Sequence, residues 1–285
     1  MIQSMTGYGK HVVQLPSKKI TIEIKSLNSK NLDINTRIPS SYREKELKIR
    51  NILAGALTRG KVDFSLYIEM TGEATNTQVN TALVKEYMAQ LKQVADGSPI
   101  ELLKMAVRMP DALKTERDEI DEDEYEEILK AIAVALTEIN TYRSDEGEVL
   151  KNDFLNRIDA IENLLKDVAE IDADRIENVR QRLRTAVSEL EERVDENRFE
   201  QELIYYLEKY DITEEKVRLQ NHLDYFREAI ASEDSNGKKL GFITQEIGRE
   251  INTIGSKSNF APMQQMVVQM KDELEKIKEQ ALNVL

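Results

Sequence analysis

The chain has 285 residues, enough for one large domain or two ordinary ones; 33% of them are charged, and the net charge is −13. The absence of cysteine excludes a disulfide framework, a thiol nucleophile and a Cys-ligated zinc site. No apolar run approaches the roughly 18 residues that span a bilayer, and no signal-peptide pattern opens the chain. We therefore expect a cytoplasmic protein with no membrane partner.

The charge is unevenly distributed. Residues 1–70 carry 12 Lys and Arg against 6 Asp and Glu, a balance of +6, which leaves −19 for residues 71–285. Nucleic acid binds to local clusters of Lys and Arg and does not depend on the total charge of a protein. A basic head on an acidic body is therefore compatible with RNA as a partner.

The first 70 residues predict a small α+β unit with an antiparallel or mixed sheet. Apolar residues alternate with polar ones, or form short apolar runs, in four expected strands: 2–15, 20–24, 32–38 and 62–70. Between the last two strands, apolar residues at helical spacing predict a helix over 47–57, and Gly60 is placed to end it.

Basic residues and asparagines are interleaved in this first unit. They form either an RNA-backbone surface or an ordinary solvated surface, and the sequence alone leaves both readings open. The candidates for RNA contact are Lys25, Asn28, Lys30, Arg37, Arg59 and Lys61.

The chain then divides into three expected parts. Residues 1–110 form an N-terminal α+β RNA-binding domain, which ends with a helix that Asn80 caps and a shorter helix after Pro99. Residues 111–127 hold ten Asp and Glu and predict a solvated acidic connector. Residues 128–285 form a helical domain.

The helical domain is predicted to contain a protruding hairpin or an oligomer seam. Two long charged helices, at about 149–170 and 173–196, contain no Gly or Pro, and helices this polar and long form such features. The last helix, 263–281, carries an apolar stripe that either seals a subunit interface or packs within the same chain.

A candidate catalytic stripe follows the edge of another apolar helix face. Glu246, Glu250 and Lys257 share one side of a helix with Thr253. Carboxylates beside an apolar face are partly desolvated, which is costly unless a metal, a base or hydrogen-bond donors satisfy them. The alternative is a solvated flank with ordinary ion pairs between neighbouring turns.

A second candidate cluster precedes this stripe in the sequence. Asp211, Glu215 and His222 fall beside a buried stripe of their own helix, and Asp211 and Glu214 have the spacing of a capping box. Glu215 and His222 are seven residues apart, roughly 10 Å along a helix, so one metal ion cannot take both. His222 is then a metal ligand, a general acid or base, or a packed histidine.

An oxygen-rich site with one histidine suits Mg²⁺ or Mn²⁺ more than zinc. Either Lys257 or Arg218 is placed to neutralise charge on a phosphodiester in transfer. The candidate metal ligands are Asp211, Glu214, Glu215, Glu246 and Glu250, and the candidate catalytic residues are His222, Glu246, Glu250 and Lys257.

Four stretches resemble the bacterial YicC/YloC family: Ser4–Gly9, Arg143–Leu150, Asp211–Phe226 and Phe242–Ser258. The resemblance covers nearly the whole chain. It implies a cytoplasmic endoribonuclease that cuts RNA with a divalent metal and is built as a clamp-like homo-oligomer, a hexamer in the family. Three positions depart from the family pattern, which has aspartate at Gly241, asparagine at Gly248 and a polar residue at Phe260.

The sequence thus predicts an α+β protein, with a small N-terminal sheet domain followed by a long all-α domain. The expected function is metal-dependent hydrolysis of single-stranded RNA. The alternatives are a non-catalytic RNA-binding adaptor of the same fold and a purely structural helical scaffold.

Overall fold

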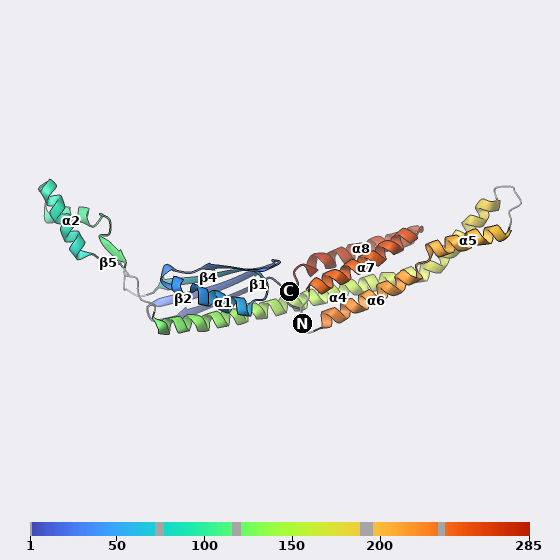
Figure 1. The fold of residues 1–285 in the computed structure, drawn as a ribbon, viewed down its shortest axis with the longest axis horizontal. Coiled ribbons are helices and arrows are strands. Elements are labelled where there is room, and N and C mark those ends of the chain that lie inside the picture. The colour runs from blue at the N-terminus through green and yellow to red at the C-terminus, as the bar shows by residue number, and fades with distance from the viewer. Residues whose placement is uncertain (1, 72–76, 116–120, 189–195, 233–236) are drawn as a thin grey trace.

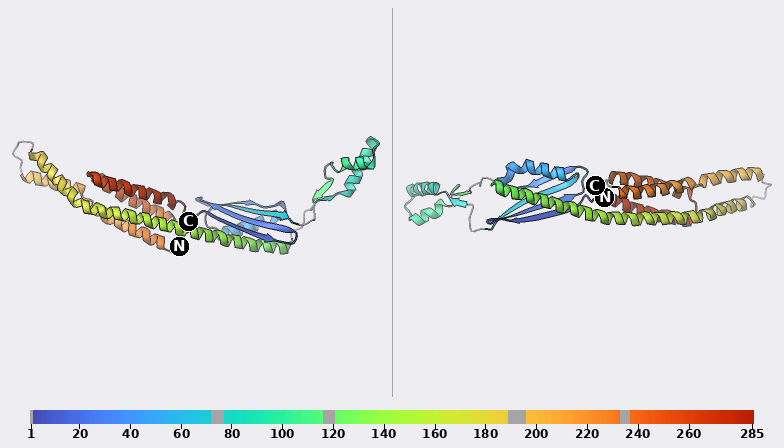
Figure 2. Two further views of the ribbon diagram at one scale, coloured as in Figure 1. Left: turned by 180° about the vertical axis from the view of Figure 1, so that it is seen from behind. Right: turned by 90° about the horizontal axis from the view of Figure 1, so that it is seen from below.

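The molecule is organised along one very long helix. The computed structural model describes residues 2–71, 77–115, 121–188, 196–232 and 237–285 (Figure 1). Helix α4 (Glu122–Ser188) has 67 residues, or roughly 100 Å at 1.5 Å per residue. A small sheet packs on its first half and helices pack on its second half, which confirms the predicted α+β fold (Figures 1 and 2).

The sheet is mixed and has the strand order β1-β2-β4-β3. Its strands are β1 (Gly7–Gln14), β2 (Lys18–Leu27), β3 (Leu32–Arg37) and β4 (Gly60–Met70). Strand β2 pairs antiparallel with β1 and with β4, whereas β3 pairs parallel with β4. A parallel pair needs a crossover, which the 3₁₀ helix η1 (Ser40–Lys45) and helix α1 (Glu46–Ala56) provide.

One face of the sheet is covered and the other is open. Alternate residues of β2 and β4 are buried against α1 and the first half of α4 (Figure 2): Ile20, Ile22, Ile24, Val62, Phe64 and Leu66. Residues of α4 from Tyr125 to Ile139 complete this core. Residues 128–139, which were expected to belong to the helical domain 128–285, therefore contribute to the core of the sheet.

The glycines of the opening motif allow α4 to approach β1 closely. A Cβ on Gly9 would lie 2.2 Å from the carbonyl oxygen of Ala135, and a Cβ on Gly147 would lie 2.1 Å from the carbonyl oxygen of Ile2. Real Cβ atoms do not approach so near, so only glycine fits at these two crossings. The close packing explains the glycines in the Ser4–Gly9 and Arg143–Leu150 stretches.

A small unit lies beyond one end of the strands, on the side away from the two chain termini (Figure 1). It consists of β5 (Thr77–Val79), α2 (Thr81–Val94), α3 (Pro99–Ala106) and β6 (Leu113–Thr115), with a core of its own around Val84, Ala106 and Ala112. As expected, the side chain of Asn80 accepts a hydrogen bond from the N–H of Leu83 at the start of α2.

The acidic segment 111–127 is more structured than a solvated connector. It contributes β6 and the first turn of α4, and its residues 116–120 lie outside the described part of the chain. Glu124 is buried, accepts a hydrogen bond from the hydroxyl of Tyr42 and forms a 2.7 Å ion pair with Lys18. The expectation of full solvation is wrong here because these partners compensate the buried carboxylate.

The second half of α4 packs with the C-terminal helices. These are α5 (Glu196–Tyr210), α6 (Thr213–Ala231), α7 (Gly237–Lys257) and α8 (Ala261–Ala281). Their shared core contains Phe154 and Ile158 of α4, Leu219 and Phe226 of α6, Ile247 and Ile251 of α7, and Met270 and Ile277 of α8. The apolar stripe expected in 263–281 is buried inside the chain, so it is not free to seal a subunit interface.

Two separate helices were expected at 149–170 and 173–196, and this is wrong, because α4 runs unbroken to Ser188. The apolar pattern weakens after Val168, but no Gly or Pro interrupts the backbone hydrogen bonds. Residues 189–195 lie outside the described range.

The two ends of the chain meet at the middle of the molecule (Figure 1). Ser4 forms an antiparallel bridge with Val284, and the N–H of Leu285 donates to the carbonyl of Gln3 at 2.9 Å. This contact closes the junction between the sheet and the helices. Within the described ranges, no helix combines the length and the apolar character that a membrane span requires.

Candidate functional site

The two candidate clusters come together along the seam between α6 and α7. The ammonium of Lys257, at the end of α7, lies 2.8 Å from Oε1 of Glu215 at the start of α6. The two helices therefore run antiparallel, and this pair fixes their register. His222 lies seven residues after Glu215, and Glu250 lies seven residues before Lys257. The register thus places His222 and Glu250 at about the same level of the seam.

Glu250 is the most unusual member of this seam. Glu250 is 5% exposed and lies on the same helix face as Ile243, Ile247 and Ile254. Glu246, one turn earlier, is half-buried. Within the described part of the chain, neither carboxylate has a hydrogen bond or an ion pair. A carboxylate on a mostly buried residue, with no partner among the described residues, is available to water or a ligand, which makes Glu250 a candidate for a functional group.

Glu215 and Lys257 form a partly satisfied pair. Lys257 donates to Oε1 of Glu215 and, at 2.9 Å, to the carbonyl oxygen of Asp211. Oε2 of Glu215 is buried and has no hydrogen-bond partner. Lys257 therefore ties the end of α7 to the start of α6 and keeps one proton for a further acceptor. Among the carboxylate oxygens of the described residues, Oε2 of Glu215 is the one that is both fully buried and without a hydrogen-bond partner.

Asp211 and Glu214 lie at the outer end of the seam and are exposed. Oδ1 of Asp211 accepts from the N–H and the hydroxyl of Thr213, at 2.9 and 2.7 Å. These two bonds, with help from Lys257 and Lys216, hold the pKa of Asp211 below its ordinary value. Glu214 forms an ion pair with Arg218. Asp211 thus stabilises the start of α6, and Glu214 points to solvent.

Sequence reasoning missed a buried polar network at the same end of the seam. Arg175 of α4 is 1% exposed, pairs with Asp172, and donates to the carbonyl oxygens of Tyr210 and Lys257 at 2.7 and 3.2 Å. Lys216 completes the network by donating to Asp172 at 2.8 Å. Arg175 therefore satisfies the C-terminal carbonyls of α5 and α7, where a cation is favourable. Nothing in the charged sequence of α4 singles this arginine out.

The carboxylates of the seam do not form a closed metal cage. Among the described residues, no group of three or more His, Asp or Glu is arranged to hold a metal ion. Mg²⁺ and Mn²⁺ sites that act on phosphates use one or two carboxylates together with water and substrate oxygens. Glu250, which has no partner among the described residues, fits that open arrangement, whereas Glu215 lies about 10 Å away along the seam. Asp211 and Glu214 are engaged elsewhere.

The six residues proposed for RNA contact fall into two groups. Lys25, Arg37 and Lys61 are exposed on the open face of the sheet, where Glu23 pairs with Lys25 at 3.3 Å. Lys30 is exposed in the turn between β2 and β3.

Asn28 and Arg59 instead bind backbone at the junction. Asn28 donates to the carbonyl of Leu282 at 2.7 Å, and Arg59 donates to the carbonyl of Ser29 at 3.0 Å. Asn28 thereby links the sheet to the C-terminal end of the chain.

Comparison with known proteins identifies the family of this chain. A model described as "Endoribonuclease YicC-like, N-terminal region" matches residues 2–152, and one described as "Endoribonuclease YicC-like, C-terminal" matches residues 168–285. These ranges divide the chain within α4, whose two halves belong to different cores.

Two curated relatives align over their full length and that of this chain. The "Probable endoribonuclease YicC" of Clostridioides difficile strain 630 is 35% identical, and the protein of the same name from Haemophilus influenzae strain Rd is 30% identical. The chain therefore belongs to the YicC-like endoribonuclease family. This membership supports RNA cleavage as its activity.

Proposed function

We propose that this chain is a metal-dependent endoribonuclease that hydrolyses phosphodiester bonds in single-stranded RNA at the α6–α7 seam, and that it works as a clamp-like homo-oligomer. One observation carries the location of the site. Glu250 is buried, is level with His222 and has no partner among the described residues. A fold that had only to pack its helices gains nothing from such a carboxylate.

Each residue of the seam has a role in this proposal. Glu250 would hold a Mg²⁺ or Mn²⁺ ion together with water and the RNA, and Glu246, one turn away, would orient bound water. Glu215 lies two helical turns further along the seam, about 10 Å away, so it does not share this ion. A divalent ion bound there would supply positive charge that stabilises the phosphodiester as its charge increases during the reaction. His222 transfers the proton between water and the leaving oxygen, because an imidazole can both accept and donate a proton.

Lys257 acts mainly through position. Its bonds to Glu215 and to the carbonyl of Asp211 fix the register of α6 against α7. The register sets the separation of His222 from Glu250. Loss of this lysine therefore weakens cleavage by displacing the other groups as well as by removing a positive charge.

The proposal is tested by cleavage of a labelled single-stranded RNA with Mn²⁺, Mg²⁺ or EDTA. We expect cutting with either metal, none in EDTA, and a loss of at least about 100-fold in Glu250→Gln, the scale of general acid–base and electrostatic contributions. Glu214→Gln is the matched control, since Glu214 is an exposed glutamate of the same seam, and it should cut within about threefold of the wild type.

The main alternative is an RNA-binding adaptor that does not cut. It would bind RNA with the same salt dependence under every metal condition and leave the RNA intact. Equal cutting by Glu250→Gln and the wild type would place the site elsewhere.

A further inference from the structure

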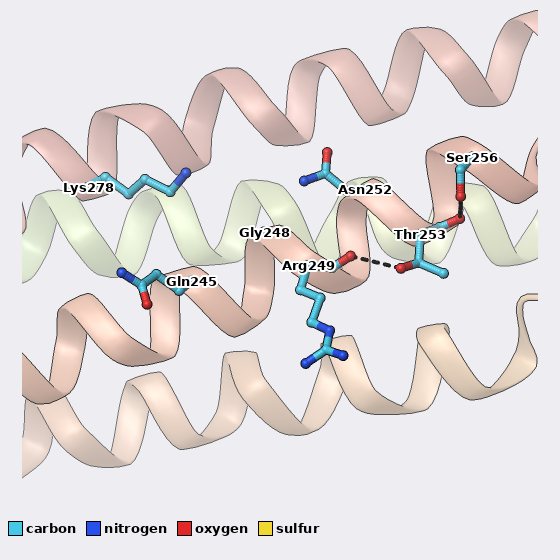
Figure 3. A pocket seen from close by; sticks show the side chains of 7 residues that line it. All are labelled: Gln245, Gly248, Arg249, Asn252, Thr253, Ser256 and Lys278. Carbon is cyan, nitrogen blue, oxygen red and sulfur yellow. Dashed lines mark hydrogen bonds between the residues drawn. The ribbon is translucent and has the colours of Figure 1, made fainter.

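The exposed side of α7 carries a groove that the candidate catalytic residues do not use. The groove has a volume of about 560 Å³ and lies between α7 and α8 (Figure 3). Its lining comprises Gln245, Gly248, Arg249, Asn252, Thr253 and Ser256 of α7 and Lys278 of α8. Its α7 members belong to the Phe242–Ser258 stretch and, apart from Thr253, lie on a different side of the helix from Glu246 and Glu250.

The chemistry of the lining is that of a site for a polyanion. It contains two cations, two amides and two hydroxyls but no carboxylate, in a chain whose net charge is −13. Arg249 is exposed and has no ion pair among the described residues. Lys278 pairs with Glu275 at 3.2 Å, but both side chains are exposed, so this surface pair is weak.

The two cations flank the groove instead of converging on one point. Figure 3 shows Lys278 reaching in from α8, whereas the guanidinium of Arg249 extends from the opposite side of the α7 ridge, with Gln245 and Asn252 between them. A single phosphate ion would be held by donors that converge. Cations on both sides of a polar ridge fit an extended chain with a phosphate on each side.

Glycine keeps the groove open on the α8 side. A Cβ on Gly248 would meet Cδ2 of Leu274 at 3.1 Å and lie 3.9 Å from Nζ of Lys278. A longer side chain at position 248 would therefore occupy the space in front of Lys278. Gly248 was noted above as a departure from the family pattern, and this geometry gives the departure a physical consequence.

The groove and the α6–α7 seam lie on adjacent sides of one helix. Successive residues of a helix are turned by about 100°, so Arg249 and Glu250 are neighbours in sequence that face the groove and the seam respectively. Thr253 lies between the two sides. A strand that crosses the ridge of α7 from Lys278 past Arg249 arrives at Glu250.

We infer that this groove is a binding subsite for single-stranded RNA, in which Lys278 and Arg249 hold two phosphates of the strand next to the bond that is cut, while Gln245 and Asn252 contact the nucleotide between them. This inference rests on the proposed function for the direction of the strand. The binding itself is independent of cleavage and is measured separately.

The test is fluorescence anisotropy of a labelled 12-nucleotide RNA in EDTA, over a range of salt concentrations. Each of Arg249→Gln and Lys278→Gln should raise Kd about 3- to 10-fold and lower the slope of log K against log salt by about 0.7, and the double variant should lower it by about 1.4. Arg182→Gln, an exposed arginine on the distal part of α4, is the matched control and should stay within twofold of the wild type.

The outcomes separate the groove from the nuclease. If the wild type cuts RNA and both variants bind RNA as tightly as it does, the groove is not an RNA-binding subsite, and the proposed nuclease function stands. If both variants bind RNA more weakly and the wild type does not cut RNA, the groove is an RNA-binding subsite, and the proposed nuclease function is refuted.

Two further results would also overturn the subsite. If inorganic phosphate displaces the RNA when its concentration equals that of the RNA's phosphate groups, the groove is a site for a single phosphate ion. A change in sedimentation coefficient caused by Arg249→Gln, with the salt slope unchanged, would show that the groove is a contact between copies of the chain.

Discussion

The buried network around Arg175 provides the sharpest test of how the seam is held in place. In Arg175→Met the side chain keeps much of its volume but loses its pair with Asp172 and its bonds to the carbonyls of Tyr210 and Lys257. Breaking a buried ion pair by removing one partner costs about 3–5 kcal/mol. Asp172 keeps Lys216 at 2.8 Å, so we expect the lower end of that range, about 3 kcal/mol.

The assay is thermal unfolding followed by circular dichroism at 222 nm. For a chain of this size, 1 kcal/mol corresponds to about 2–4 °C in Tm, so Arg175→Met should unfold about 6–12 °C below the wild type. Arg180→Met is the matched control on the same helix, because Arg180 pairs with Glu177 at 3.3 Å with side chains 40% and 63% exposed. A surface pair of that kind contributes about 0–1 kcal/mol.

Equal Tm values for the two variants would refute the reasoning, because they would show that burial of Arg175 adds nothing to the stability of the seam. A large loss for Arg175→Met alone would support it. The same variant should also cut RNA more slowly if the register of α7 positions Glu250, and cleavage assayed well below its Tm checks that consequence.

Three further predictions follow from packing and charge. Gly9→Ala should lower the free energy of unfolding by at least about 2 kcal/mol, since its Cβ would lie 2.2 Å from the Ala135 carbonyl, and chemical denaturation measures this loss. Gly241→Asp should raise Tm slightly, because no atom lies within 4 Å of the new Cβ and glycine weakens a helix; a fall in Tm would contradict this. A hydrogen bond from Gln220 lowers the pKa of Glu162, and one from Lys276 lowers the pKa of Glu273; a nearby arginine adds to each effect. These carboxyls stabilise the fold above the ordinary glutamate pKa near 4.3, and Tm should fall as the pH drops below it, whereas a flat profile from pH 5 to 3 would argue against their role.

Much of the fold could be predicted because its signals are local. The alternation in 20–24 and 62–70 identified β2 and β4, and Asn80 marked the start of α2, because strand periodicity and helix capping depend only on neighbouring residues. The continuity of α4 was not predicted, since its polar stretch after Val168 resembles the end of one helix and the start of another. Only packing against the sheet and then against the C-terminal helices shows one helix in two cores.

The candidate site divides in the same way. Spacing placed Glu246, Glu250 and Lys257 on one side of a helix, and the sequence named Glu215 and His222 as members of a second cluster. It did not show that Lys257 bonds to Glu215, that Asn28 binds the carbonyl of Leu282, or that Glu250 lacks a partner among the described residues.

By itself, the sequence determined the fold class, the helix faces and the family resemblance, because periodicity and motif spacing depend only on residues that are close together in the sequence. The tertiary structure decided which charges are buried, which are paired and which line a groove. In the sequence, three charged residues look alike: Arg175, Glu250 and Arg249. In the fold, Arg175 is buried and paired with Asp172, Glu250 has no partner among the described residues, and Arg249 is exposed. The reason is physical: desolvation and pairing depend on residues that lie far apart along the chain and meet only in the fold.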